Sequence, residues 1–203
     1  MKKIVLASNN QGKLTEFQRL FSKIDIEVIP QSVMGIPECP EPHITFVENA
    51  LTKARHASQH SGLPALADDS GICSIALQGA PGVHSARYAG ISPKSDQANN
   101  AKLDEELNHY ADKSIFYVCV LVLVRHANDP QPIIAEANWY GQWQSQAAGS
   151  NGFGYDPHFY LVEHHKTAAQ MTQNEKNRFT HRAQALRILL SKLQQQANNN
   201  AHV

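Results

Sequence analysis

The sequence lacks the features that would point to a polyanionic or apolar partner. Its 203 residues carry 18 Lys and Arg against 18 Asp and Glu, so the formal net charge is zero. A protein that binds nucleic acid through its phosphates usually carries a basic excess, so we expect no nucleic-acid partner. The strongest apolar run, residues 118–124, has the length of a strand, whereas a helix that crosses a bilayer needs roughly 20 apolar residues. We therefore expect no membrane partner, and any small anion must meet a local group of positive charges.

Cysteine is also scarce. The three cysteines, Cys39, Cys73 and Cys119, are odd in number, far apart and without a C-x-x-C pair. This pattern excludes a disulfide or zinc framework and indicates reduced thiols in a cytoplasmic protein. After Met1-Lys2-Lys3 only four apolar residues follow, so the apolar region and cleavage site of a signal peptide are missing.

Hydrophobic periodicity predicts alternating strands and helices along the chain. We expect strands at 2–8, 26–29 and 65–77, and helices at 14–24, 45–62 and 95–110. Two β-rich runs, 115–125 and 131–141, are separated by Asn128-Asp129-Pro130, which predicts an antiparallel hairpin. The fold class is therefore α/β with a mixed sheet and flanking helices.

Capping residues mark several helix ends. Thr45 and Glu48 form a capping-box pattern, and Gly62 ends the helix that follows. Thr172 and Glu175 form a second such pattern, after which either one helix continues or Thr180 caps a separate one. We expect one domain over residues 1–193 and a frayed Gln/Asn-rich tail over 194–203.

The first candidate site lies between a strand and a helix. Such a turn exposes backbone N–H groups at the positive end of a helix dipole, which favours phosphate. The glycine pattern of a Walker loop is absent, and an Asn-rich turn that only caps the helix is the alternative. The candidate phosphate-binding residues are Ser8, Asn9, Asn10, Gln11, Gly12 and Lys13.

Acidic residues form the second candidate site. Asp68 and Asp69 end a strand, and because adjacent strand residues point to opposite faces, we do not expect them to share one task. One could act as a metal ligand or base, and Glu41 could complete a Mg²⁺ site, since hard cations select carboxylate oxygens. Lys53 follows on a helix and could bring a cation to the same ligand. A solvated acidic turn and a surface lysine are the alternatives.

Two later segments could contact a base. Three glycines surround Phe153 in the loop 149–157, so the ring could be exposed and stack on a planar base. The alternative is that the aromatic residues of this loop enter the core. Lys176, His181 and Arg182 lie near a helix start, where they would suit a carbonyl oxygen or a phosphate. The alternative is that His181 is a structural histidine.

Taken together and in order, these segments resemble the inosine/xanthosine triphosphate pyrophosphatase family over residues 4–190. The matching stretches are Ser8-x-Asn10-x-x-Lys13, Glu41, Thr45-Phe46-x-Glu48-Asn49-Ala50 to Lys53-Ala54, Ala67-Asp68-Asp69-Ser70-Gly71, Gly79-Ala80-Pro81-Gly82, Ser85-Ala86-Arg87-Tyr88, Gly152-Phe153-Gly154-Tyr155-Asp156-Pro157, and Lys176 followed by Thr180-His181-Arg182. The family pattern is broken by Pro42-His43, where Thr-Gly is usual, and by His158, where an apolar residue is common.

The resemblance implies two lobes around a nucleotide cleft, a homodimer, and Mg²⁺-dependent hydrolysis of ITP, dITP and XTP to the monophosphate and pyrophosphate. Such an enzyme keeps deaminated bases out of DNA and RNA. Carried over by position, the resemblance gives Glu41 and Asp69 as Mg²⁺ ligands and Asp69 as proton acceptor. It gives the following substrate-binding residues: Ser8, Asn9, Asn10, Gln11, Gly12, Lys13, Lys53, Ser70, Phe153, Gly154, Tyr155, Asp156, Lys176, His181 and Arg182.

Two other functions remain open at this point. The chain could be a pyrophosphatase for another damaged nucleotide, such as a modified pyrimidine. It could also bind a nucleotide or RNA through the same loops without turnover. The acidic pair Glu41 and Asp69 argues against a pure phosphate binder, because carboxylates repel phosphate unless a metal ion lies between them.

Overall fold

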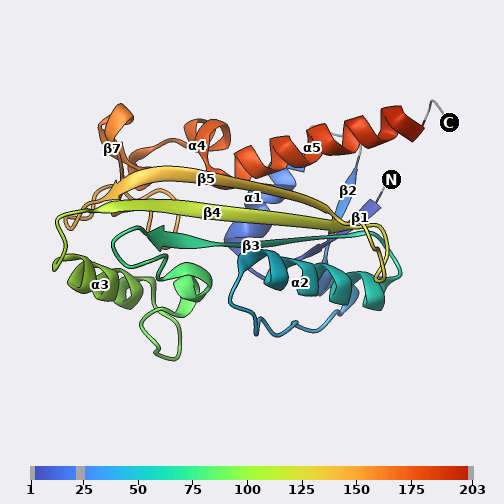
Figure 1. Ribbon diagram of the computed structural model, residues 1–203, viewed down its shortest axis with the longest axis horizontal. Helices are drawn as coiled ribbons and strands as arrows, with labels where there is room; N and C mark the ends of the chain where they lie inside the picture. The colour runs from blue at the N-terminus through green and yellow to red at the C-terminus, as the bar shows by residue number, and fades with distance from the viewer. Residues whose placement is uncertain (1–2, 22–25, 201–203) are drawn as a thin grey trace. The chain divides into compact units, whose positions relative to one another are not determined.

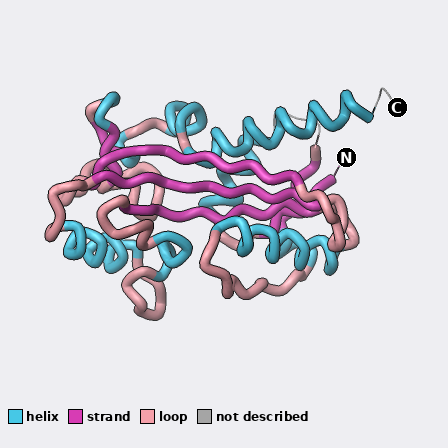
Figure 2. Tube along the Cα trace, in the orientation of Figure 1, coloured by secondary structure: helices cyan, strands magenta, loops and turns pink. Residues whose placement is uncertain are grey.

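The computed structural model describes residues 3–21 and 26–200 and contains a seven-stranded sheet (Figures 1 and 2). The strand order is β2-β1-β3-β4-β5-β6-β7. β1 pairs in parallel with β2 and β3, whereas β6 pairs antiparallel with β5 and β7, so the predicted mixed sheet is confirmed. The strands are β1 (Lys3–Ala7), β2 (Glu27–Pro30), β3 (Ala65–Ser74), β4 (Ser114–Val124), β5 (Ile133–Trp143), β6 (Phe159–Leu161) and β7 (Lys166–Thr167).

Helices and short 3₁₀ turns connect the strands. The α-helices are α1 (Gln11–Phe21), α2 (Phe46–Ser61), α3 (Asp96–Leu107), α4 (Gln173–Phe179) and α5 (His181–Asn200). The 3₁₀ turns are η1 (Gln31–Met34), η2 (Gly82–Arg87), η3 (Val162–His164) and η4 (Ala168–Gln170). The segment 35–45 that leads into α2 holds no helix or strand (Figure 2).

The chain divides into two compact units. The first unit comprises Met1–Asp69, Cys119–Ala137 and Arg182–Val203, and the second comprises Ser70–Val118 and Asn138–His181. Strands β3, β4 and β5 each have residues in both units. In the first unit, α2 and α5 lie on opposite sides of the strands (Figure 1).

Each unit has its own apolar core. In the first unit the apolar strand residues Ile4, Leu6 and Leu121 pack with Phe17 of α1 and Leu189 of α5, and all of them are buried. The apolar faces of α1 and α5 are therefore buried in this core, as the hydrophobic periodicity predicts. An amphipathic helix is stabilised mainly by burying its apolar face.

The core of the second unit is rich in aromatic side chains. Phe159 lies with its ring centroid 4.7 Å from that of Tyr117 and 4.9 Å from that of Trp139. Leu103 and Leu107 of α3 are fully buried in the same cluster. These contacts fix α3 and β4 to the rest of the unit.

The predicted helix caps agree with the structure. Thr45 Oγ1 accepts a hydrogen bond from the N–H of Glu48 at 3.3 Å, and Gly62 adopts the left-handed conformation (φ 67°) that ends α2. Thr172 caps α4 through a complete capping box with Glu175. The question left open at Thr180 is resolved in favour of two helices, because α4 ends at Phe179 and α5 begins at His181.

Several predicted boundaries differ from the structure. β3 ends at Ser74 rather than at residue 77, and α3 ends at Leu107 rather than at residue 110. α5 continues to Asn200, beyond the end at Leu193 that the apolar pattern predicts. Gln and Ala are good helix formers, and no Gly or Pro interrupts residues 194–200, so the helix has no local reason to stop. The predicted end of the first helix at 22–24 lies outside the described residues.

Two further findings bear on the environment of the chain. Within the described ranges, no helix combines the length and the apolar character that a membrane span requires. Cys39, Cys73 and Cys119 are all free thiols, as their spacing predicts.

Candidate active site

The turn from β1 to α1 is shaped by its own polar side chains. Asn10 Oδ1 accepts a hydrogen bond from the N–H of Lys13 at 3.1 Å, and Ser8 Oγ accepts one from the N–H of Asn10 at 3.3 Å. Asn9 donates to Glu38 Oε1 and accepts from Gln31 Nε2, which ties the turn to η1 and the loop beyond it. The turn therefore caps the helix, and that role is compatible with anion binding by the same helix end. Gly12 lies in the first turn of α1, and the side chain of Gln11 is outside those that the structure describes.

Asp68 is fully buried and surrounded by positive groups. Lys13 Nζ lies 2.7 Å from Asp68 Oδ1, and Arg182 Nε lies 3.8 Å from Asp68 Oδ2. The thiol of Cys119 donates to Asp68 Oδ2 at 3.7 Å. Burial alone would raise the pKa of Asp68, but the charges of Lys13, Arg182 and Lys53 outweigh it and hold that pKa well below its ordinary range. Asp68, which lies on β3, thus holds the side chains of Lys13 and Arg182 in place through its charge.

Lys53 joins the two other acidic candidates. Its ammonium lies 2.6 Å from Glu41 Oε1 and 3.4 Å from Asp69 Oδ1, so α2 brings the loop carboxylate and the strand carboxylate to one point. Burial raises the pKa of Asp69, and the nearby charges of Lys53 and Lys13 only partly oppose it. Burial would lower the pKa of Lys53, but Asp69, Asp68 and Glu41 raise it, so the ammonium form is favoured.

The loop that carries Glu41 is held from α2. Asn49, which is buried, accepts a hydrogen bond from the N–H of His43 at 3.0 Å and donates to the carbonyl of His43 at 3.2 Å. The ring of His43 also pairs with Thr52 Oγ1 at 3.0 Å. The unusual Pro42-His43 pair is therefore accommodated by two side chains of α2, and this anchoring role of Asn49 was not predicted from the sequence.

The donor set of the first unit fits a Mg²⁺ ion. Glu41 and Asp69 supply carboxylate oxygens at one place, and Mg²⁺ is commonly bound by one or two carboxylates together with water and substrate phosphates. Among the described residues, no three His, Cys, Asp or Glu side chains gather as a ready-made metal cage. The carboxylates of Glu41 and Asp69 thus fit the donor set of a Mg²⁺ ion that is also bound by water and phosphate.

The second unit holds a separate charged cluster. Lys176, which is buried, donates to Asp156 Oδ2 at 2.6 Å and to the carbonyl of Asn151 at 3.1 Å. Tyr117 donates to the other carboxylate oxygen of Asp156 at 3.0 Å. Gly152 packs directly on this pair, since a β-carbon there would lie 2.1 Å from Asp156 Oδ2. Tyr117 is a supporting residue that no local sequence signal indicated.

The aromatic candidates of the second unit differ in exposure. The Phe153 side chain is 42% exposed, as base stacking would require, whereas Tyr155 is 5% exposed and donates to the carbonyl of Ser85 at 2.7 Å. The alternative that the aromatic residues of this loop enter the core therefore holds for Tyr155 but not for Phe153. His181 is buried and stacks on Tyr117 with centroids 4.7 Å apart and planes 8° apart. Ser70 lies on β3 and is half-buried.

The candidate residues thus form two groups, each within one unit. The first unit brings together Lys13, Glu41, Lys53, Asp69 and Arg182 through the contacts of Asp68 and Lys53. The second unit brings together the loop 152–156 and Lys176. The other departure from the family pattern, His158, stacks on Trp143 at 4.7 Å and binds the carbonyl of Gln144, so it is a packing residue.

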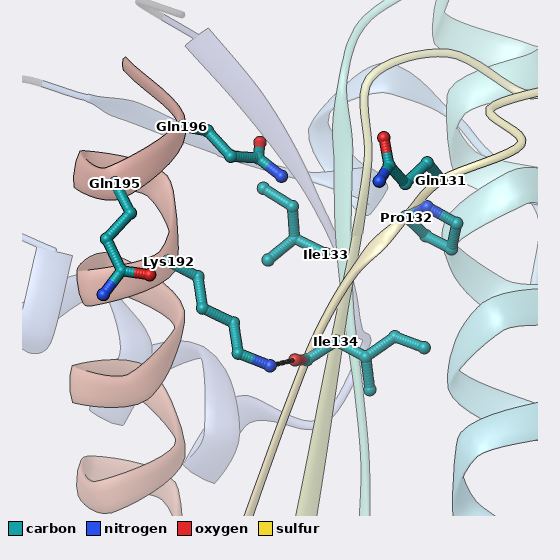
Figure 3. A pocket seen from close by; sticks show the side chains of 7 residues that line it. All are labelled: Gln131, Pro132, Ile133, Ile134, Lys192, Gln195 and Gln196. Atoms are coloured by element: carbon teal, nitrogen blue, oxygen red, sulfur yellow. Dashed lines mark hydrogen bonds between the residues drawn. The ribbon is translucent and has the colours of Figure 1, made fainter. Parts of the chain in front are cut away.

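A cavity of about 270 Å³ also opens in the first unit, between the start of β5 and the end of α5 (Figure 3). Lys192 Nζ crosses it to the carbonyl of Ile134 at 2.6 Å. None of the candidate site residues lines it. Its lining residues are Gln131, Pro132, Ile133, Ile134, Lys192, Gln195 and Gln196.

Comparison with known proteins agrees with this assembly of motifs. The model of the Ham1 family matches residues 4–192. The chain belongs to the Ham1 family. This confirms the resemblance inferred from the motifs, and the fold class agrees with it.

Relatives of this Ham1-family chain cover nearly its whole length. A dITP/XTP pyrophosphatase of Neisseria meningitidis serogroup B is 68% identical over 95% of this chain and 96% of the relative. One of Ralstonia nicotianae is 61% identical over 95% of this chain and 97% of the relative. The solved structure of a HAM1 protein from Coxiella burnetii is 46% identical, with a TM-score of 0.90 over 96% of this chain and 100% of that one.

Proposed function

We propose that this chain hydrolyses deaminated purine nucleoside triphosphates, namely ITP, dITP and XTP, to the monophosphate and pyrophosphate. Two relatives with 68% and 61% sequence identity to this chain are dITP/XTP pyrophosphatases, which supports the proposed substrate class. The observation that carries the proposal is the position of Lys53, whose ammonium lies between the carboxylates of Glu41 and Asp69. By removing such triphosphates, the enzyme would keep damaged bases out of DNA and RNA.

In the proposed reaction Glu41 and Asp69 would hold Mg²⁺. When bound, the metal would withdraw charge from the phosphate oxygens and orient the triphosphate. Lys13 and Lys53 reduce the repulsion that the phosphates exert on an attacking hydroxide. The turn from Ser8 to Lys13 would bind phosphate oxygens at the positive end of the α1 dipole.

Asp69 is the proposed proton acceptor. Burial raises its pKa, which makes its carboxylate a better base than that of an exposed aspartate. It orients a water molecule and takes its proton, so that oxygen attacks phosphorus and pyrophosphate leaves. Asp68, buried between Lys13 and Arg182, keeps these cations in place rather than acting as a second base.

Phe153, His181 and Arg182 are proposed to act on the base. Phe153 offers an exposed ring for stacking on the base. Lys176, which lies beside Asp156, would instead screen the triphosphate together with Lys13 and Lys53. His181 and Arg182 would donate hydrogen bonds to the 6-keto oxygen of a purine. Adenine would be rejected, because its 6-amino group is itself a donor. Guanine shares the 6-keto group, so its exclusion would come from the 2-position, where buried polar groups can discriminate strongly.

The proposed enzyme is a cytoplasmic homodimer. The three free thiols suit a reducing compartment, and the homodimer is supported by the family resemblance. Light scattering on the purified chain tests the oligomeric state directly.

A substrate panel tests the proposed function. The purified chain is incubated with ITP, dITP, XTP, GTP, ATP and a modified pyrimidine triphosphate, with Mg²⁺ or with a chelator, and pyrophosphate is measured. We expect release from the first three only, and only with Mg²⁺. Comparable release from ITP and GTP would contradict the base assignment, preference for the pyrimidine would favour the altered-substrate enzyme, and binding without release would favour a nucleotide-binding module.

A further inference from the structure

The loop that carries Phe153 is anchored at both ends in the second unit. At its start, Asn151 donates from its N–H to the carbonyl of Ala169 at 2.9 Å and from Nδ2 to the carbonyl of Met171 at 3.2 Å. At its end, Asp156 is held by Lys176 and Tyr117. The tip between these anchors consists of Phe153 and Gly154.

Helix α3 binds the backbone of the tip. The carboxylate of Asp96 accepts a hydrogen bond from the N–H of Gly154 at 2.8 Å, and Asn100 Nδ2 donates to the carbonyl of Gly154 at 3.1 Å. Asp96 and Asn100 are one helical turn apart and therefore share a face of α3. Both polar groups of the Gly154 backbone are thus bound from one helix face.

The helix that provides these contacts is itself rigidly held. Asn99 is buried, accepts from the N–H of Ala89 at 2.8 Å and donates to the carbonyl of Ala86 at 3.2 Å. Leu103 is fully buried in the aromatic core of the unit. Ser95 caps the helix by accepting from the N–H of Ala98. Because α3 is well anchored, its hydrogen bonds to Gly154 hold the tip of the loop in a defined position.

We infer that Asp96 and Asn100 are positioning residues for base recognition, because they hold the Gly154 backbone and so orient the adjacent Phe153 ring. The inference rests on the proposed function, in which Phe153 stacks on the purine. Gly154 adopts a left-handed conformation (φ 65°) and has more backbone freedom than any other residue type. Without the two hydrogen bonds, ordering of the tip would oppose binding of the base.

Kinetics of four variants test the inference. Asp96→Ala and Asn100→Ala each remove one hydrogen bond, Asp96→Asn keeps an oxygen that can accept from Gly154, and Gln97→Ala is the matched control on an exposed neighbour. We expect Asp96→Ala and Asn100→Ala to raise the KM for ITP about fivefold, the worth of one hydrogen bond. The value of kcat should stay within about twofold, since the tip does not touch the reacting phosphorus.

Two further readouts separate positioning from general damage. Inorganic triphosphate has no base, so its inhibition constant should be equal for wild type and all four variants. Asp96→Asn should restore the wild-type KM. Because Asp96 would act through Phe153, the double variant Asp96→Ala with Phe153→Ala should have the KM of Phe153→Ala alone.

Three results would overturn the inference. They are an unchanged KM in both alanine variants, an equal weakening of ITP and inorganic triphosphate, and additive effects of the Asp96 and Phe153 substitutions. Thermal unfolding of each variant shows whether it is folded, and Asn100→Ala carries the test if Asp96→Ala is not. Wild-type enzyme that releases no pyrophosphate from ITP would instead refute the proposed function.

Discussion

Gly152 lies against Lys176 so closely that a β-carbon would come within 2.3 Å of the Lys176 ammonium nitrogen. The same β-carbon would lie 2.1 Å from Asp156 Oδ2, so any side chain at this position must displace the partly buried ion pair of Lys176 and Asp156. We expect Gly152→Ala to lower kcat/KM for ITP by about 100-fold, because small misplacements in a site have effects of that size. Steady-state kinetics with ITP measure this loss.

Gly90→Ala is the matched control for that substitution. Gly152 (φ 96°) and Gly90 (φ 69°) both have a positive φ, but a β-carbon at Gly90 meets nothing within 4 Å. It should therefore cost only the backbone strain of about 1–2 kcal/mol and leave turnover unchanged. Equal kinetic losses in the two variants would show that the contact of Gly152 with the ion pair is irrelevant.

Asp68→Asn should destabilise the fold. The substitution leaves Lys13 and Arg182 without their buried counter-charge, and removal of one partner of a buried ion pair typically costs about 3 kcal/mol or more. Chemical denaturation measures the free energy of unfolding. The control is Glu27→Gln, which breaks an exposed pair with Lys3 at 2.9 Å and should cost less than about 1 kcal/mol. Equal losses in the two variants would contradict the role of Asp68.

The stability of the chain should fall in acid partly through Asp129. Hydrogen bonds from Arg125 hold the pKa of Asp129 well below its ordinary value of 3.8, although burial opposes this. Since the folded pKa is the lower one, the carboxylate stabilises the fold above the ordinary value, and this stabilisation is lost as pH falls through the folded pKa. We expect the free energy of unfolding to drop from about pH 5 downwards.

Asp129→Asn and Arg125→Gln test whether Asp129 causes this loss of stability at low pH. Asp129→Asn should be less stable than wild type at pH 7, and the difference should shrink as pH falls. Arg125→Gln removes the guanidinium that lies 2.5 Å from Asp129 Oδ1, so it should act in the same direction. A stability difference that stays constant with pH would rule out this contribution of Asp129.

The sequence predicts local structure well where local chemistry decides it. Thr45 with Glu48, Gly62 and Thr172 with Glu175 mark helix ends because the capping groups are neighbours in the chain. It fails at Leu193, where the apolar pattern ends although nothing there breaks the helix. Composition is thus a weaker guide to a helix end than a residue that stops the helix.

The candidate site shows the same division. The residue types of Glu41, Lys53 and Asp69 suggest that the three side chains bind one ligand. Only the folded structure shows that the carboxylates of Glu41 and Asp69 both lie against the ammonium of Lys53. The hold of Asp96 on Gly154 joins residues far apart in the chain through a backbone group, and a backbone group has no sequence signature. The packing of Gly152 on an ion pair likewise requires the folded chain.

Asp69→Asn tests the role of the strand carboxylate most directly. The measurement is the initial rate of pyrophosphate release from ITP at saturating Mg²⁺, with circular dichroism to confirm that the variant is folded. We expect a fall of at least about 100-fold relative to wild type, the contribution of a general base. A folded Asp69→Asn enzyme with an initial rate near that of wild type would contradict the assignment of Asp69 as proton acceptor.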